Sequence, residues 1–392
     1  MRQHLIDPEI CIRCNTCETR CPTGAISHAA NYVVDPEICN FCMRCVRPCP
    51  TGAIDNWFNV TRPFTLTEQH EWTILPQPEP ELERPVPDAF DDEATRILTI
   101  AHQGLGGVAR APASASKPRI NAFTRAAPAR ATVVGNSRIT AEDCNSDVHH
   151  IILDFGAEPF AYLEGQSIGI VPPGLDANGR PHEMRLYSAA SARDGERPNT
   201  NNMALTVKRI AGDGVTGVAS NWLCDRVLGD SFDVVGPFGA TFLMPDDPQA
   251  DLLMICTGTG VSPFRGFTHR RRRTAPHGPG GLYLFFGART PGELPYFGPL
   301  QRYLQTELHR ELVYSRVNLE EHEYVQDRLE RRADLVAGLL TKPTTHLYVC
   351  GLKGLEAGVE QAIGRISAAH GLDWPAIRSA LRQEGRMHVE TY

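Results

Sequence analysis

Two copies of one cysteine motif near the N-terminus constrain the fold of this 392-residue chain more than any other feature. The flanking residues repeat too, because DPEIC and CPTGAI both recur at the 28-residue offset that separates Cys11 from Cys39. Three closely spaced thiolates on a tight loop can bind one side of a cubane, and the fourth ligand must come from elsewhere. The repeat therefore predicts two 4Fe–4S clusters. The motifs are Cys11-x2-Cys14-x2-Cys17-x3-Cys21-Pro22 and Cys39-x2-Cys42-x2-Cys45-x3-Cys49-Pro50.

The fourth cysteine of each motif is expected to ligate the cluster of the other motif, as it does in two-cluster ferredoxins. The segment resembles bacterial two-cluster ferredoxins over about 50 residues. Structural zinc and disulfides are the alternatives, but zinc usually takes two separated pairs of ligands, and disulfides need an oxidising compartment. One predicted cluster takes Cys11, Cys14, Cys17 and Cys49, and the second takes Cys39, Cys42, Cys45 and Cys21.

Composition excludes several classes of protein. The net charge of −7 argues against nucleic-acid binding, which favours a basic excess. No apolar run approaches the roughly 20 residues of a membrane-spanning helix. The N-terminus enters the first motif without the apolar segment of a signal peptide. We therefore expect a cytoplasmic protein that binds neither nucleic acid nor a membrane.

The rest of the chain changes character twice, so a multidomain fold is predicted. Residues 76–88 are proline-rich and acidic and cannot form a core, which indicates a linker with one short helix in 93–104. Short alternating segments then predict an antiparallel β-barrel, and alternating strands and helices predict a doubly wound α/β domain with a parallel sheet. The predicted domains are 1–62 (small α+β two-cluster ferredoxin domain), 63–121 (Pro/Ala-rich linker), 122–248 (FAD-binding β-barrel) and 249–392 (NADP-binding α/β domain).

A Gly258-Thr259-Gly260 turn joins a predicted strand over 252–257 to a predicted helix that opens at Ser262-Pro263. Glycines there let backbone N–H groups approach a pyrophosphate at a helix N-terminus. An ordinary strand-to-helix turn is the alternative that this motif alone leaves open.

Several segments together resemble one family, the plant-type ferredoxin–NADP⁺ reductases, from about Ala122 to Tyr392. The resemblance implies that Arg185 pairs with the FAD pyrophosphate, Tyr187 packs on the isoalloxazine and the Ser188 hydroxyl reaches the flavin N5. In the second flavin motif Ala219 stands where many members have Cys. The matching segments are RLYS (185–188), LTVKR (205–209), GVAS (217–220), GPFG (236–239), TGTGVSPFR (257–265), CGLKGLE (350–356) and HVETY (388–392).

The resemblance also implies the cofactor-binding and catalytic residues. In the family, the pair Ser315-Arg316 and Tyr324–Arg328 holds the adenosine 2′-phosphate of NADPH, whereas an NAD enzyme is expected to place a carboxylate there. Val317 and Asn318 depart from the commoner family sequence. The FAD set is Arg185, Leu186, Tyr187, Ser188, Lys208, Gly217, Val218, Ala219, Ser220 and Tyr392. The NADP set is Thr257, Gly258, Gly260, Pro263, Ser315, Arg316, Tyr324, Gln326, Gly351 and Leu352.

Four residues are expected to take part in the reaction: Ser188, Cys350, Glu390 and Tyr392. By resemblance, Cys350 lies against the nicotinamide C4, Tyr392 stacks on the flavin where the nicotinamide must land, and Glu390 sits near Ser188. The ordinary alternatives are a buried core thiol and a frayed chain end. Met387 replaces a common Trp.

Other features suit structural roles. The basic run 269–273 is interpreted as a solvated face at a helix end, with docking of an acidic partner as the alternative. His149-His150 is interpreted as surface or core. Three further cysteines are expected to be buried small hydrophobes: Cys144, Cys224 and Cys256.

The predicted protein is an NADPH-dependent reductase that passes single electrons from FAD through two clusters to a separate protein. None of its 14 histidines follows a Glu by three residues, so the Glu-x-x-His pairs of di-iron oxygenases are missing. The domain order resembles the reductase component of an epoxidase, which predicts a separate oxygenase as acceptor. A general donor to a reductase, P450 or nitrogenase-type acceptor, and a wiring subunit of a permanent complex, remain alternatives.

Overall fold

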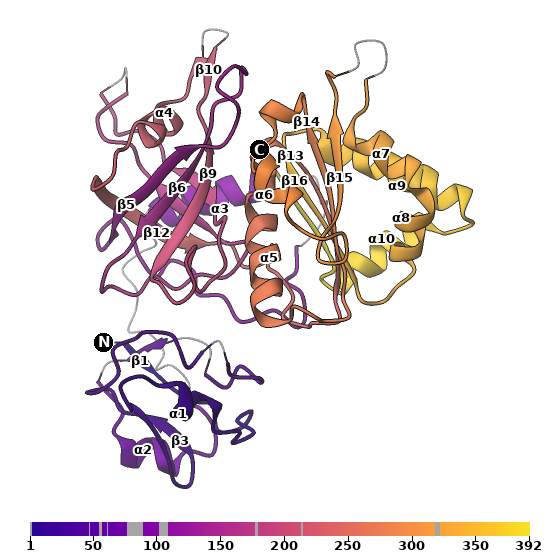
Figure 1. Ribbon diagram of the computed structural model, residues 1–392. Helices are drawn as coiled ribbons and strands as arrows, with labels where there is room; N and C mark the ends of the chain where they lie inside the picture. Colours follow the sequence, from indigo (N-terminus) through magenta and orange to yellow (C-terminus); the bar gives the residue numbers. More distant parts are fainter. Residues whose placement is uncertain are drawn as a thin grey trace. The chain divides into compact units, whose positions relative to one another are not determined.

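The computed structural model divides the chain into two compact units, each described here by itself (Figure 1). The first unit is Met1–Asp88 with Arg197–Asn201, and the second is Ala89–Glu196 with Asn202–Tyr392. None of the helices in the described part of the chain combines the length and apolar character needed to cross a membrane. The structure describes residues 2–46, 48–54, 57–60, 62–76, 89–101, 109–176, 179–212, 215–317 and 322–392.

The first unit is a small α+β module whose two halves repeat. Gly24 and Gly52 stand at equivalent positions of the repeat with φ of +69° and +71°, a conformation that glycine adopts without steric cost. Its core combines apolar side chains with Cys17 and Cys45. The elements are β1 (Arg2–His4) paired with β4 (Trp57–Asn59), β2 (Ile26–His28) paired with β3 (Tyr32–Val34), and the helices α1 (Thr16–Arg20) and α2 (Leu66–Glu71).

The second unit begins with a six-stranded antiparallel sheet in the order β8-β7-β12-β5-β6-β9. An isolated bridge from Ala189 to Leu205 links the ends of the two edge strands β8 and β9. Closure of this sheet into a barrel remains a prediction. The elements are β5 (Ala129–Arg138), β6 (Val148–Asp154), β7 (Ser167–Ile170), β8 (Arg185–Ser188), β9 (Asn202–Lys208), the hairpin β10 (Ala211–Gly212) and β11 (Val215–Thr216), α4 (Val218–Cys224) and β12 (Ser231–Phe238).

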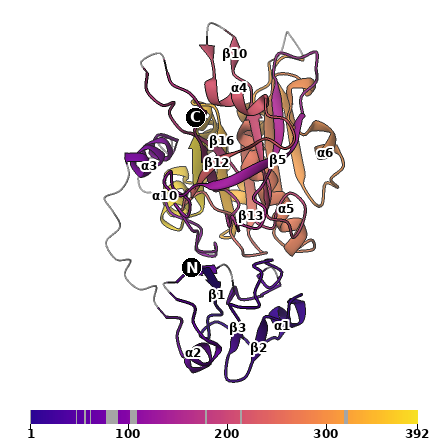
Figure 2. The same cartoon turned by 90° about the vertical axis from the view of Figure 1, so that its left-hand side faces the viewer.

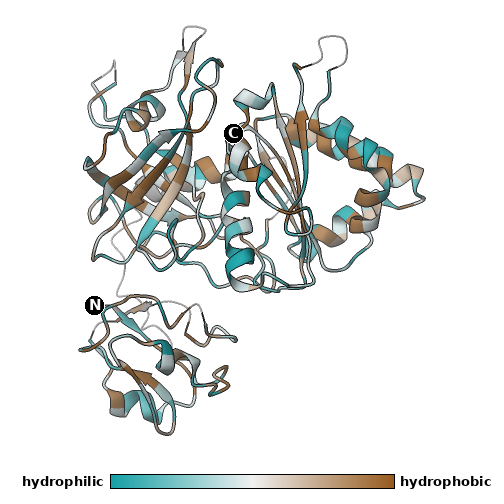
Figure 3. Cartoon of the chain, in the orientation of Figure 1, coloured by the Kyte–Doolittle hydropathy of each residue, from teal (hydrophilic) through white to brown (hydrophobic). Residues whose placement is uncertain are grey.

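The second sheet of this unit is parallel throughout, in the order β15-β14-β13-β16-β17. Strands β13 and β16 at its centre are buried along nearly their whole length, as expected when helices cover both faces of a sheet, and Figure 3 colours the hydrophobic residues of the sheet brown. The strands are β13 (Asp251–Thr257), β14 (Leu282–Ala288), β15 (His309–Tyr314), β16 (Thr345–Gly351) and β17 (Met387–Thr391). A strand was predicted over 252–257, and β13 is present there.

Helices cover the parallel sheet on both sides (Figure 1). Leu252 and Met254 face α5 and its Phe264, whereas Leu253 and Ile255 pack with α7 to α10. The helices are α5 (Val261–Thr274), α6 (Phe297–Gln301), α7 (Val325–Arg331), α8 (Ala333–Leu340), α9 (Leu355–Ala369) and α10 (Trp374–Gln383). The result is the doubly wound α/β arrangement predicted for this part.

The range 63–121, predicted as a linker, contains segments that are packed on both units. Gln69 of α2 bonds the amide and carbonyl of Val34 at 3.0 and 2.9 Å, within the first unit. Helix α3 (Ala89–Ala101) matches the helix predicted in 93–104 and belongs to the second unit, as do residues 109–121. Two runs of the predicted linker, 77–88 and 102–108, lie outside the described residues. Apolar residues within α3 explain the difference, because they can bury a face that the proline-rich stretch cannot.

Candidate functional site

Four thiols from both motifs surround one cavity in the first unit. Tyr32 and Ile54 also line this cavity. Burial raises the pKa of Cys17 to about 11, with the neighbouring thiols as a further cause. Three of these thiols come from the first motif and the fourth from the second: Cys11, Cys14, Cys17 and Cys49.

The remaining four thiols make a second group with the reciprocal composition. Burial raises the pKa of Cys45 to about 12, and its thiol neighbours add to the shift. Those neighbours are Cys39, Cys42 and Cys21. The structure therefore brings together the same two sets of thiols that crossed ligation requires.

The loops between the thiols share a backbone shape that suits an anionic cluster. Arg13 and Asn15 have φ of +54° and +61°, and their repeat equivalents Phe41 and Met43 have +57° and +62°. Left-handed residues in a turn direct successive N–H groups into a concave site for anions, including iron–sulfur clusters. Within the described residues, no three Cys, His, Asp or Glu side chains are placed to hold a metal ion. A cubane differs from a single-ion site. Each of its four thiolates binds a different iron atom, so the thiolates surround the whole cluster and do not converge on one point.

The nucleotide turn lies at the carboxyl end of β13, where open α/β sheets bind their ligands. A Cβ at Gly260 would lie 2.1 Å from the carbonyl oxygen of Cys350, so only glycine fits there. Gly258 has a φ of +55°. The hydroxyl of Thr257 is buried and has no hydrogen-bond partner among the described residues. Pro263 lies in the first turn of α5, as the motif predicts.

Two hydrogen bonds join this turn to residues of the predicted flavin site. The hydroxyl of Ser262 donates to the carbonyl oxygen of Ser188 at 2.8 Å. The hydroxyls of Thr259 and Tyr392 lie 2.8 Å apart. The amide of Tyr392 donates to the carbonyl of Gly351 at 3.0 Å, so the terminal residue is held in place rather than frayed.

Cys350 and Glu390 are cross-strand partners on β16 and β17. They are 1% and 7% exposed. Burial raises the pKa of Glu390 to about 7 and also raises the pKa of Cys350. The Glu390 Oε2 atom is buried without a hydrogen-bond partner among the described residues. A carboxyl with this pKa can exchange a proton near neutral pH.

The predicted FAD residues lie on β8 and around the start of α4. Tyr187 and Trp222 pack against the same apolar core, and burial raises the pKa of Tyr187. Arg185 is exposed and pairs with Glu183 at 3.1 Å. A Cβ at Gly217 would lie 2.5 Å from the Ser220 hydroxyl, so this turn needs glycine. The amides of the three residues that follow Gly217 have no carbonyl within the helix to bond with.

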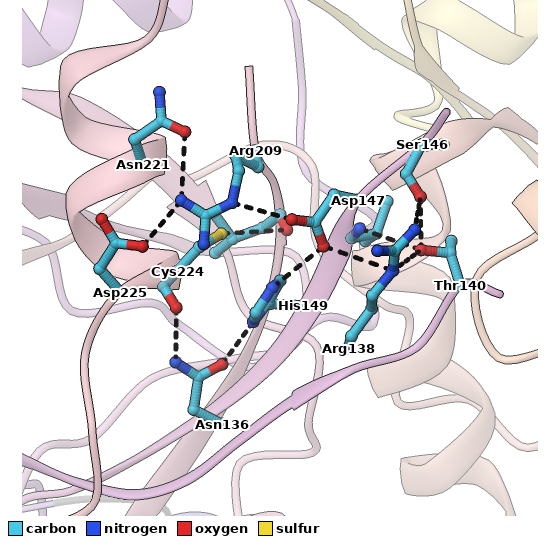
Figure 4. Close-up of polar contacts among 12 residues, drawn as sticks. Asn136, Arg138, Thr140, Ser146, Asp147, His149, Arg209, Asn221, Cys224 and Asp225 are labelled. Atoms are coloured by element: carbon cyan, nitrogen blue, oxygen red, sulfur yellow. Dashed lines mark hydrogen bonds and ion pairs between the residues drawn. The ribbon is translucent and has the colours of Figure 1, made fainter. Parts of the chain in front are cut away.

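A polar network fixes α4 to the antiparallel sheet (Figure 4). Arg209 at its centre donates to Asp147 at 2.8 Å and to Asn221 at 3.3 Å, and lies 2.8 Å from Asp225. The Nδ2 of Asn221 in turn donates to the carbonyl of Ile210 at 3.0 Å. Figure 4 also shows His149 between Asp147 and Asn136, so this predicted surface or core residue is part of the network.

The predicted 2′-phosphate residues lie near the ends of β15 and α7. Arg316 is exposed, and its amide donates to the carbonyl of Arg289 at 2.8 Å. Tyr324 is the N-cap of α7 and is 51% exposed. The Nδ1 of His322 and the carbonyl of Ser315 are 2.6 Å apart, which brings the two ends together. Asn318 lies outside the described residues. Gln326 is half-buried. Lys208, the last residue of β9, and Leu352, which follows β16, are exposed.

The basic run on α5 is not the solvated face that we predicted. The guanidinium of Arg271 is buried and donates to the carbonyls of Pro248, Gly280, Asp247 and Ala250. Arg273 pairs with Asp194 at 2.8 Å. The carbonyls around Arg271 lie on the loops before β13 and after α5, 9 to 24 residues away in the chain, and Asp194 is 79 residues from Arg273, so a run of basic residues could not reveal these partners.

One ion pair that sequence reasoning missed fixes α5 to the loop after β8. Arg265 pairs with both oxygens of Glu196 at 2.6 Å. The guanidinium also lies over the ring of Tyr296, 4.9 Å from its centre. Desolvation opposes the charge of Glu196, but Arg265 and His150 hold its pKa well below its usual range. Cys144 is only half-buried, whereas Cys224 and Cys256 are buried as expected.

Known proteins match both units. The family model of the 4Fe-4S binding domain matches residues 4–27 and 32–55, and that of the oxidoreductase NAD-binding domain matches 254–361. The ferredoxin–NADP reductase of the Cyanophora paradoxa cyanelle is 38% identical over 288 residues, which cover 70% of this chain and 79% of that protein. The Thermosynechococcus vestitus ferredoxin–NADP reductase is 37% identical over 291 residues, covering 70% and 75%. A ferredoxin–NADP⁺ reductase structure from Plasmodium falciparum has a similar fold, with a TM-score of 0.56, 23% identity, and coverage of 70% of this chain and 99% of that one.

Proposed function

This chain belongs to the ferredoxin–NADP reductase family, and from that premise we propose that it drives a separate oxygenase with electrons from NADPH. It is an NADPH-dependent oxidoreductase with FAD, NADP and two 4Fe–4S clusters as its cofactors. One observation carries the proposal. The reductase fold and two crossed groups of four thiols occur in a single chain. A reductase that carries its own ferredoxin module makes the transfer intramolecular.

The chemistry follows from the cofactors. When bound, FAD takes a hydride from NADPH and releases its electrons singly, and each cluster accepts one electron at a time. The chain's residues position these groups. We propose that Arg185 and the amides after Gly217 hold the FAD phosphates, while Ser188 and Tyr187 orient the flavin. Ser262 supports this arrangement, because its bond to the Ser188 carbonyl sets β8 against the nucleotide turn.

The nicotinamide side involves three further residues. We propose that Cys350 contacts the nicotinamide, that Glu390 holds a proton nearby, and that Tyr392 covers the flavin face until the nicotinamide displaces it. The burial of Cys350 and the raised pKa of Glu390 support these roles. The remaining predicted NADP residues line the carboxyl ends of the parallel strands, which suits the rest of the coenzyme.

The proposed acceptor is a benzoyl-CoA 2,3-epoxidase, which would place the chain in aromatic degradation. The order of ferredoxin module, proline-rich segment and reductase supports this acceptor. A general electron donor and a wiring subunit are the competing functions. We also propose a cytoplasmic location. None of the twelve cysteines forms a disulfide, which suits a compartment that keeps thiols reduced.

The experiment has two stages. Rapid mixing of the purified chain with NADPH should bleach the flavin and then reduce the clusters, as seen by EPR without any other protein. Clusters that stay oxidised would contradict the proposed path. Adding the epoxidase with benzoyl-CoA should then raise NADPH consumption. If a P450 or nitrogenase-type acceptor raises it and the epoxidase does not, the general donor is correct. Stoichiometric co-purification with an acceptor would indicate the wiring subunit.

Replacing Arg209 with alanine should weaken FAD binding. The change removes the bonds that hold α4 and its phosphate-facing start against β9, and a charged hydrogen bond contributes about 1.5–3 kcal/mol. We expect the FAD dissociation constant to rise about ten-fold, measured by flavin fluorescence. Arg130 is a matched control, because its ion pair with Asp233 is 62% and 61% exposed. If Arg209→Ala and Arg130→Ala bind FAD alike, the network does not support the flavin site.

Replacing Tyr392 with serine should weaken the preference for NADPH. The ring competes with the nicotinamide for the flavin face, and aromatic stacking contributes about 0.5–1.5 kcal/mol beyond burial. The variant should give a stronger NADP⁺-induced flavin difference spectrum and a ratio of NADPH to NADH activity lower by about two- to ten-fold. The Thr259→Val variant removes only the hydroxyl partner of Tyr392, so its preference should change less. A spectrum and a ratio both unchanged in Tyr392→Ser would exclude the stacking role.

A further inference from the structure

Helix α3 precedes residue 122, where the resemblance to the reductases begins, yet it packs on the reductase unit (Figures 1 and 2). Its Ala94 is 2% exposed and lies in an apolar cluster with Met184, Val235 and Phe238. Leu98, one turn later, packs against the same cluster. This spacing of four residues gives α3 one apolar face, and that face is covered.

A polar contact fixes the same helix to the flavin strand. The Glu93 Oε1 accepts the backbone N–H of Met184 at 3.1 Å, immediately before β8 begins at Arg185. The guanidinium of Arg125 lies 3.9 Å from the other carboxylate oxygen. Leu186 of β8 also belongs to the cluster that α3 covers, and it points to the opposite face from Arg185 and Tyr187.

Helix α3 touches the two strands that carry the proposed reaction residues. Besides its contacts at β8, it lies against β17. Both are edge strands, β8 of the antiparallel sheet and β17 of the parallel one. Ser188 ends the first strand, and Glu390 lies in the second. The helix therefore occupies the junction of the flavin and nicotinamide halves of the reductase unit.

We propose that α3 is an anchor that fixes the ferredoxin module's connecting chain at this junction and so speeds electron transfer from the flavin to the clusters. The proposal rests on the proposed function, because it requires that transfer. The segment that covers this junction is α3, which belongs to the same chain. The first unit holds its side of the connection through Asn31, whose Nδ2 donates to the carbonyl of Trp72 at 2.6 Å.

The lengths of chain show how an anchor would act. From Trp72 to Ala89 the connection is 17 residues, whereas from Trp72 to Arg110 it is 38 residues. Arg110 is the next fixed point, because its guanidinium donates to the carbonyl of Gln383 at 3.1 Å. For a connection longer than the span that it bridges, effective concentration falls as about the −3/2 power of its length. Release of α3 should therefore slow a transfer limited by encounter by about three-fold.

The test uses the full chain with its cofactors. Ala94→Asp buries a charge in the apolar contact and should release α3, which faster hydrogen exchange over residues 93–101 would report. Thr95→Asp is the matched control, because it adds the same charge at the adjacent exposed position. After mixing with NADPH, flavin bleaching should be unchanged in both variants. Cluster reduction should slow about three-fold in Ala94→Asp only.

A second variant keeps the proposal testable if Ala94→Asp fails to fold. An insertion of about 21 Gly/Ser residues after Glu81 lengthens the connection by as much as α3 release would, with the helix still docked. It should slow cluster reduction to the same extent. An unchanged rate of cluster reduction in the insertion variant would overturn the anchor. The same holds for an unchanged rate in an Ala94→Asp chain whose α3 shows fast hydrogen exchange. Loss of FAD from Ala94→Asp would also overturn it. Clusters that NADPH never reduces in the unmodified chain would instead refute the proposed function.

Discussion

The Cys21→Ala variant should lose the cluster built on the second motif and keep the one built on the first. Cys21 lies with the thiols of the second motif, since its charge contributes to the raised pKa of both Cys39 and Cys45. Crossed ligation makes Cys21 the proposed fourth ligand of a cubane whose other three thiolates come from that motif. Its removal should then leave one iron without a thiolate.

Iron analysis and EPR would measure the result. We expect about half of the iron to remain, with one set of cluster signals instead of two. The reciprocal Cys49→Ala variant should lose the other set. Cys144→Ala is the control, because Cys144 is a free thiol outside both motifs and should leave both clusters in place. Loss of the first-motif cluster from Cys21→Ala would contradict crossed ligation.

The Arg316→Ala variant should raise the KM for NADPH by about ten-fold or more and leave the KM for NADH nearly unchanged. A guanidinium binds a phosphate with charged hydrogen bonds, and losing one costs about 1.5–3 kcal/mol. NADH has no 2′-phosphate, so its binding does not include this contribution. Arg316 is exposed at the end of β15, free of an ion pair in the described structure, so its removal should not disturb the fold.

Steady-state kinetics with both coenzymes would test this prediction. Arg302 is a suitable control, because it is also exposed but lies beyond α6 rather than at the coenzyme end of the sheet. Arg302→Ala should change neither KM. Equal increases for NADPH and NADH in Arg316→Ala would show that Arg316 does not recognise the phosphate.

Patterns local in the chain allowed much of this structure to be predicted. The cysteine repeat predicted the two thiol sets, since ligand spacing within a loop is fixed by the cluster. The Gly258 turn was predicted because strand, turn and helix are consecutive. The helix in 93–104 was predicted from its apolar spacing, but its docking was not, because Glu93 and Met184 are 91 residues apart in the chain.

Contacts between distant segments explain the misinterpretations. Arg265 and Glu196 are 69 residues apart, and neither residue type indicates a partner by itself. The basic run after Arg265 looked solvated for the same reason. A sequence shows the charge of Arg271, whereas only the folded chain shows the four carbonyls that surround it.

The ion pairs along α5 also limit how the two halves of the reductase unit can move. Opening a hinge between them would break the buried pairs Arg265–Glu196 and Arg273–Asp194. The Arg265–Glu196 pair is bidentate, and bidentate charge-assisted pairs are the stronger ones, so this pair favours the arrangement in which the two halves stay together. We therefore expect coenzyme to enter and leave without separation of the two halves. The movement that this requires would then be local, such as a turn of the Tyr392 ring away from the flavin face.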